Sequence, residues 1–205
     1  IQTYNDQIIV NALGIQCDVG APMPPTETLV VDKPLTSLGD TLTYTTTYTN
    51  MGGTAAAEQT TYTSQPALGL SFIPGSVTVN GVPTPGADPS VGVNVGTVAI
   101  GQTVTVTYQL RVDALPLEPA PARYDVEGEW SYDFLSCPGM PSNHSVGSAG
   151  VATTYVNRLV ATKSADSAGA YLPGEPITYT IVVRNNGETP TSGTTLRDPL
   201  APYLI

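Results

Sequence analysis

The stretch GDTLTYTTTYTNMGGT, residues 39–54, decides the fold of this chain. Its side chains alternate with a period of two, which places successive residues on opposite faces of a β-strand. One face is an unbroken row of threonines, which we expect to face solvent. The other face, which we expect to face a core, carries Leu42, Tyr44, Thr46 and Tyr48. The stretch therefore predicts a half-buried strand that ends in a turn at NMGG.

Residues 29–156 continue this pattern and predict about eight short strands separated by Gly and Pro turn signals. In SVTVNGVPT the pair Asn80-Gly81 tolerates positive φ, which suits the type I′ turn of a hairpin. Trp130 is the only tryptophan; it lies in the middle of the strand YDVEGEWSYDF and is expected to anchor the core. We therefore predict an all-β fold, an antiparallel immunoglobulin-like β-sandwich.

The opening motif recurs as GEPITYTIVVRNNGET, residues 174–189, and Gly174 follows Gly39 by 135 residues. Lys163 precedes the second copy much as Lys33 precedes the first. A motif that recurs at a long, regular spacing indicates tandem units. We predict three parts: an N-terminal extended segment and connector at 1–28, a full repeat at 29–157, and a partial second repeat at 158–205.

The Gly-Asp, Thr-Tyr-Thr and Asn-x-Gly motifs, together with LGLSFIPGSVTVNG, resemble the repeat known as domain of unknown function eleven. That family occurs in tandem in large bacterial and archaeal surface proteins. The resemblance covers residues 30–156 and part of 160–205, and it implies spacers, stalks or adhesive arrays without a general enzymatic role. In the first copy the pattern is held by Gly39, Asp40, Tyr44, Asn50, Gly52, Phe72, Gly75, Ser76, Val77, Asn80 and Gly81. In the second copy it is held by Gly174, Glu175, Tyr179, Asn185, Gly187 and Asp198, whereas Thr63 departs from the Asp that Asp198 matches.

The charge of the chain limits its partners. The formal net charge is −10, from 17 acidic and 7 basic residues, so no basic patch is available for phosphate and nucleic acid is not expected. No apolar run reaches the roughly 20 residues of a membrane span. The sequence begins at Ile1 without Met, which fits either a mature exported chain or a fragment of a longer one. We expect an extracellular or cell-surface location.

Cys17 and Cys137 are the only cysteines. In a chain of this composition they predict one disulfide formed in an oxidising compartment, and the alternative is two unpaired buried thiols. Neither has a partner at CxxC spacing, so a zinc site is not expected.

Catalytic and metal-binding residues are sparse. His144, the sole histidine, has no nucleophile elbow or neighbouring partner in the sequence, so we expect no enzyme and no cofactor. Asp125, Glu127 and Glu129 share one strand face and could form one wall of a Ca²⁺ site, but a solvated face is favoured.

Two covalent modifications are possible from the sequence. Lys33 and Lys163 occupy matching places, and each could form an isopeptide with an acidic or amide side chain. Ordinary lysines that discourage pairing at a strand edge are the favoured interpretation. Asn143 begins an Asn-x-Ser glycosylation sequon, which matters only in a host that glycosylates exported Asn.

A partial second unit would expose unpaired strand edges and an apolar face, which natural proteins avoid. Two explanations remain open. The chain is part of a longer array, or residues 1–28 of a neighbouring copy supply a strand through Ile8, Ile9 and Val10, with Cys17 stapled to the Cys137 loop. Both lead us to expect a structural repeat subunit of an extracellular filament, stalk or cell-surface array, whose partners are copies of itself. The alternative is a surface adhesin or carbohydrate-binding module.

Overall fold

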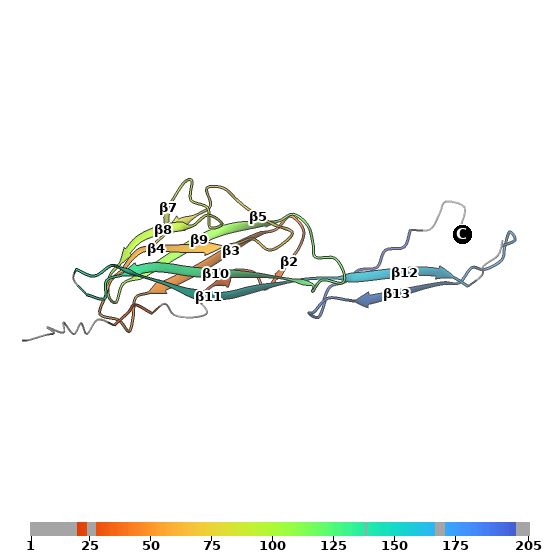
Figure 1. The fold of residues 1–205 in the computed structure, drawn as a ribbon. Helices are drawn as coiled ribbons and strands as arrows, with labels where there is room; N and C mark the ends of the chain where they lie inside the picture. The colour runs from red at the N-terminus through yellow and green to blue at the C-terminus, as the bar shows by residue number, and fades with distance from the viewer. Residues whose placement is uncertain (1–19, 24–27, 138, 167–170, 200–205) are drawn as a thin grey trace, which may run out of the picture.

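A computed structural model describes residues 20–23, 28–137, 139–166 and 171–199. Within these residues the chain is all-β, without a helix, which confirms the predicted fold class at that level (Figure 1). No helix that could cross a membrane occurs in this part of the chain. Two sheets form an elongated body, defined here as residues 28–156, and a two-stranded hairpin continues from one end of it.

The first sheet has six strands in the order β1-β3-β9-β6-β7, with β5 also on β9. Their bounds are Val30–Val31 (β1), Thr41–Thr49 (β3), Leu70–Phe72 (β5), Thr78–Val79 (β6), Val82–Pro83 (β7) and Thr103–Val112 (β9). The predicted inward row of β3 is confirmed, since all four of its side chains are fully buried. The threonine row is half-buried rather than exposed, because it lies opposite the polar row of β9. The Thr49 and Thr103 hydroxyls, for example, are 2.8 Å apart.

The second sheet has five strands in the order β2-β11-β10-β4-β8. Their bounds are Leu35–Thr36 (β2), Ala57–Ser64 (β4), Val93–Val98 (β8), Arg123–Phe134 (β10) and Asn143–Val156 (β11). The prediction of an antiparallel fold is wrong at one strand, because β2 pairs with β11 in parallel. The chain leaves the first sheet after β1, and Pro34 has no N–H with which to continue that ladder. Its carbonyl instead accepts a bond from the Tyr155 N–H at 3.0 Å.

The two sheets enclose one core, whose largest members are aromatic. Trp130 on β10 is fully buried. Its ring centroid lies 5.6 Å from that of Tyr48 and 5.1 Å from that of Tyr62, and its indole N–H donates to the Thr46 hydroxyl at 3.2 Å. Trp130 therefore links the inner faces of both sheets. Among the described residues the buried Tyr48 hydroxyl has no hydrogen-bond partner.

The third sheet is the hairpin, formed by β12 (Leu159–Ala165) and β13 (Tyr179–Asn185). All of β12 and most of β13 are exposed, so neither face of this sheet is covered as the faces of β3 are. In Figure 1 the β13 arrow points back toward the body. A two-stranded hairpin is only marginally stable in water by itself, so its attachment to the body matters.

Candidate functional site

The attachment of the hairpin to the body begins at Arg158, which lies between β11 and β12. Its guanidinium donates to two backbone carbonyls of the β9–β10 connection, that of Ala120 at 2.9 Å and that of Pro116. Its own carbonyl accepts a bond from the Asn186 N–H at 2.8 Å. Arg158 therefore joins the loop that precedes β10 to the turn that follows β13.

That turn also carries a carboxylate into the end of the body. Glu188 accepts from the Ala122 N–H at 2.9 Å with one oxygen, and from the Arg123 guanidinium at 2.7 Å with the other. Arg123 donates in turn to Asp125 at 2.8 Å. Hydrogen bonds and charge from Asp125 and then Glu188 raise the pKa of Arg123. Burial alone would raise the pKa of Asp125, but hydrogen bonds from Thr153 and Arg123 outweigh it and hold that pKa below its usual value.

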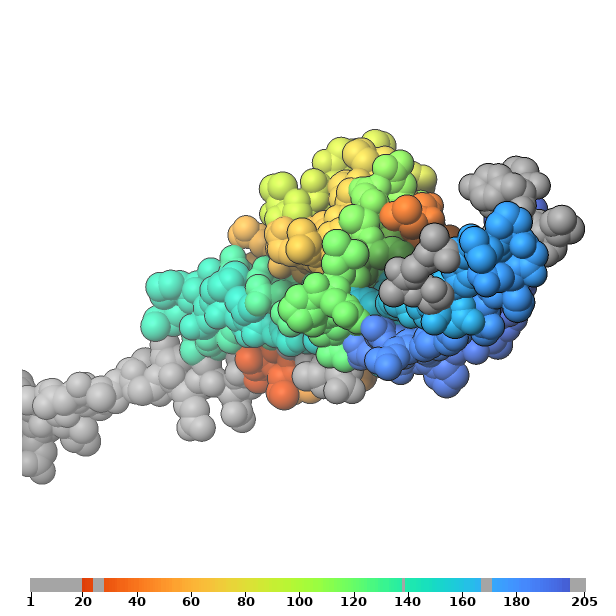
Figure 2. All heavy atoms as spheres, turned by 90° about the vertical axis from the view of Figure 1, so that its right-hand side faces the viewer, coloured from red at the N-terminus to blue at the C-terminus, as the bar shows by residue number. Residues whose placement is uncertain are grey.

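Two further contacts complete this attachment. The Asn186 side-chain amide donates to Glu118 at 2.8 Å. Gly187 leaves little space for a larger residue, since an added Cβ would lie 3.0 Å from the Asn185 Oδ1 and 3.2 Å from the Arg158 backbone nitrogen. Figure 2 shows the green atoms that precede β10 packed directly against the blue atoms of the hairpin. We call this set the joint: Glu118, Ala122, Arg123, Arg158, Asn186, Gly187 and Glu188.

The contacts of Glu188 predict that replacing this residue will measurably loosen the joint. The variant Glu188→Gln removes a charged acceptor for Arg123 and is expected to weaken the joint only modestly, because water screens an ion pair whose side chains are about one-third exposed. Amide exchange at 185–188 should then be about fivefold faster. Glu175→Gln is the matched control, because Glu175 accepts from the Leu172 N–H at the other end of the hairpin. Equal exchange rates at 185–188 in both variants would count against the joint.

The body contains a second turn of the same kind at its opposite end. Residues 50–54 hold this turn, and residues 20–23, which we call the clasp, cover it. The Gly20 and Thr54 backbones are joined at 3.0 Å, and the Tyr132 hydroxyl donates to the Pro22 carbonyl. Gly53 stands where the second copy has Glu188, and a Cβ on Gly53 would lie 2.5 Å from the Ala21 carbonyl oxygen. The same turn therefore contacts the preceding chain through a bare backbone in one copy and through a carboxylate in the other.

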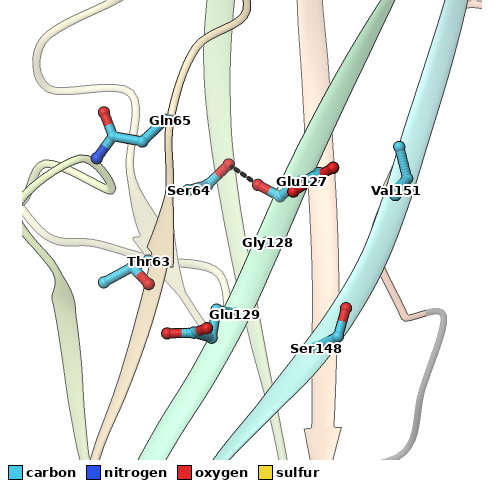
Figure 3. Close-up of a pocket in the computed structure, with 8 residues that line it drawn as sticks. All are labelled: Thr63, Ser64, Gln65, Glu127, Gly128, Glu129, Ser148 and Val151. Atoms are coloured by element: carbon cyan, nitrogen blue, oxygen red, sulfur yellow. Dashed lines mark hydrogen bonds between the residues drawn. The ribbon is translucent and has the colours of Figure 1, made fainter.

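A polar hollow of about 530 Å³ lies on the outer face of the second sheet. Figure 3 shows it between β4, β10 and β11, with two cross-strand rows of side chains. Glu129 lies between Thr63 and Ser148 in one row, while Glu127 lies between Gln65 and Val151 in the other. Beneath them the Ser64 hydroxyl donates to the Glu127 carbonyl at 2.7 Å. Two carboxylates, an amide and hydroxyls could accept hydrogen bonds from a ligand with several hydroxyl groups.

The acidic row considered for Ca²⁺ is not gathered into one site. Asp125 is bound to Arg123 and Thr153, and no group of three His, Cys, Asp or Glu that could hold a metal occurs among the described residues. The imidazole of His144 lies 2.7 Å from Asp133, and both are at the solvent-exposed end of the β10–β11 ladder.

The two lysines have different partners. Lys33 lies 3.9 Å from Asp40, whereas Lys163 contacts both carboxylate oxygens of Asp198 at 2.8 Å and lies 4.1 Å from the Tyr179 ring centroid. The Lys163 and Asp198 side chains are each about one-third exposed, so water reaches the pair. This is the arrangement of an ordinary surface ion pair.

The remaining predicted residues lie at the clasp end or outside the described residues. Cys137 follows β10 and is disulfide-bonded, but Cys17 lies outside the described residues and the pairing stays a prediction. Asn143 is exposed at the start of β11, with its amide against the Ser136 hydroxyl. Ile8, Ile9 and Val10 also lie outside the described residues.

Sequence reasoning did not find the joint. Arg158 and Glu188 are 30 positions apart and belong to no motif with a known spacing. One signal was present: Glu188 replaces Gly53 within otherwise matching turns, so the two copies differ in charge at the point of contact.

No family model and no curated protein matches the chain, so the resemblance to domain of unknown function eleven stays a prediction. Among solved structures, a chain described as "AvmM Catalyzes Macrocyclization in Alchivemycin A Biosynthesis" is similar at a TM-score of 0.36 and 12% identity. The match covers 85% of this chain and 100% of that one. The description of that protein names a catalytic activity, and we do not maintain the prediction that the present chain is not an enzyme. It rested on missing sequence motifs, and folding can assemble a catalytic site without one. A likeness this weak assigns neither a fold nor an activity to the present chain.

Proposed function

We propose that the chain is a structural repeat subunit of an extracellular or cell-surface filament, stalk or array, built from tandem immunoglobulin-like units. The observation that carries the proposal is the joint. It fixes the hairpin to the end of the body by side chains from both, and a second unit begun by this hairpin would extend along the same line. A chain whose role is to span distance needs this kind of connection.

The order of the strands supports an immunoglobulin-like unit. In that fold one sheet has the order A-B-E-D and the other contains G-F-C. Here β1-β3-β9-β6 and β11-β10-β4 follow these orders, and β8 is an additional edge strand. The Tyr124 hydroxyl donates to the Ala114 carbonyl at 2.6 Å, and a tyrosine near the start of strand F that bonds upstream backbone is typical of the fold. The tryptophan is a departure, because Trp130 lies on the F-like strand rather than on C.

The hairpin gives partial evidence for a second immunoglobulin-like unit. Asn50 and Asn185 occupy matching places, and each side-chain amide donates to a carbonyl just downstream, that of Ala55 at 3.0 Å and that of Thr189 at 2.8 Å. The register differs, however. Val30 lies opposite Thr45, while its counterpart Val160 lies opposite Arg184, which corresponds to Thr49. The shift of four residues is even, so the same side chains keep to the same face.

Immunogold labelling of source cells with an antibody against the body tests the proposal. Labels are expected in linear rows on filaments, stalks or the outer envelope. Labelling confined to the cell interior would contradict it.

The hollow in the second sheet favours a second candidate, a surface adhesin or carbohydrate-binding module. Glu127, Glu129 and Gln65 offer acceptors suited to sugar hydroxyls. A glycan array probed with the purified chain tests it, and Glu129→Ala should abolish any binding at this place. Glu58→Ala on β4 is the control, because Glu58 is exposed but lies outside the hollow.

A further inference from the structure

The hairpin has one open strand edge. Among the described residues β13 pairs with β12 alone, whereas its counterpart β3 pairs with both β1 and β9. The flanking bonds, from the Asn186 N–H to Arg158 and from the Asp166 N–H to Thr178, fix the alternation of the ladder. In an antiparallel ladder every second residue bonds to the partner strand. The backbone N–H and C=O groups of Tyr179, Ile181 and Val183 therefore point to the open edge.

The same three residues carry an apolar face. Tyr179 and Val183 are 37% and 44% exposed, and Ile181 lies between them in a half-buried position. On β12 the pairs are Ala165 opposite Tyr179 and Ala161 opposite Val183. The nearby charge of Lys163 is neutralised by Asp198. An added strand would thus gain both a ladder and an apolar surface, which is the basis of strand addition.

The segment Ile8, Ile9 and Val10 has the composition for such a strand, but within one chain it cannot reach the edge. The clasp lies beside the β9 end of the body that is far from the joint. β9 has ten residues and so spans about 30 Å, and Ile181 lies four residues beyond Asn185, about 13 Å further. Val10 is ten residues from Gly20, a reach of at most about 36 Å.

The direction of the chain is a second argument against the same arrangement, because pairing within one chain would have to be parallel. β13 runs toward the body, and a segment that leads into Gly20 of the same chain would also run that way, parallel to β13. β9 is antiparallel to β3. A segment from another copy can lie antiparallel to β13, and it then leaves at the tip of the hairpin. The body of the second copy would follow beyond that tip, without overlap with the first body.

We propose that the open edge of β13 binds the Ile8, Ile9 and Val10 segment of a second copy of this chain, antiparallel and in trans. The proposal rests on the structural role argued above and names its partner. Each copy offers one segment and one edge that differ from one another, so the contact is heterologous and repeats head to tail.

Two complementary variants test the proposal. A chain that lacks residues 1–15 keeps the edge but has no donor segment. A chain with Ile181→Pro keeps the donor segment but loses one free N–H at the edge, where proline leaves the β12 ladder intact. Each is expected to be monomeric alone by sedimentation and light scattering. Their equimolar mixture should double in mass and stop there, while the unaltered chain forms longer assemblies as its concentration rises.

Val183→Lys replaces Ile181→Pro should the proline variant fail to fold, since it blocks the same edge through a side chain. A mixture that stays monomeric would overturn the proposal. So would slow exchange of the Tyr179, Ile181 and Val183 amides in the dilute unaltered monomer, because the edge would then be covered within one chain. If the unaltered chain forms elongated assemblies and the mixture does not pair, strand addition is wrong and the structural role stands. If immunogold labels stay inside the cell, the structural role is wrong whatever the mixture does.

Discussion

Raising the pH from 10 to 11 is expected to destabilise the body by about 3 kcal/mol. Burial raises the pKa of Tyr44, Tyr48 and Tyr108 well above the ordinary value near 10. In the unfolded chain these phenols ionise from about pH 10 upward, so the folded state binds more protons there. The free energy of unfolding therefore falls as the pH rises, with a slope for each tyrosine that approaches about 1.4 kcal/mol per pH unit above pH 11. Below pH 10 their contribution is fully present.

Circular dichroism and Trp130 fluorescence, followed against pH at constant ionic strength, measure this loss. Because a domain has only about 5–15 kcal/mol in total, we expect a cooperative transition between about pH 11 and 12. Tyrosinate absorbance should rise in the same transition. The variant Tyr48→Phe removes one ionising group and its unpartnered hydroxyl, so its midpoint should move to higher pH. Gradual titration of the buried tyrosines near pH 10 with unchanged dichroism would refute the account.

The variant Trp130→Ala is expected to lower the free energy of unfolding by about 4 kcal/mol. Trp130 is fully buried between the sheets and contacts the rings of Tyr48 and Tyr62. The loss of the indole opens a cavity that aromatic neighbours on two different sheets cannot both move to fill. Trp130→Phe keeps a ring but gives up the bond to Thr46, and about half of that loss is expected.

Urea unfolding followed by circular dichroism measures both Trp130 variants, since the fluorescence probe is absent from them. Val91→Ala is the control: Val91 is 83% exposed, and its effect should stay within about 0.5 kcal/mol. A loss below about 1 kcal/mol in Trp130→Ala would mean that the core does not depend on this ring.

Local patterns in the sequence predicted much of the structure of the body. Period-two alternation gave the inward row of β3, and Asn80 and Gly81 do have the positive φ values of 50° and 77° that a type I′ turn requires. Both features depend on neighbours in the chain, so a pattern can reveal them. The shift of β2 to the second sheet could not be seen, because it depends on the distant backbone of Tyr155 as well as on Pro34.

The candidate sites were much harder to predict. The joint depends on which carbonyls a loop turns toward Arg158, and the hollow depends on three strands brought together by folding. The acids of β10 were singled out as a set, but the structure divides them. Asp125 forms a hydrogen-bonded ion pair with Arg123, whereas Glu127 and Glu129 line the hollow.

The parallel pairing of β2 with β11 has a mechanical consequence. These are the strands through which the chain enters and leaves the second sheet, one following the clasp and the other leading to the joint. Tension applied to the two ends of the body pulls them in opposite directions along their common axis. Their hydrogen bonds are then loaded in shear, all at the same moment, instead of being peeled apart one after another. Antiparallel terminal strands in the same place would open like a zipper under the same force.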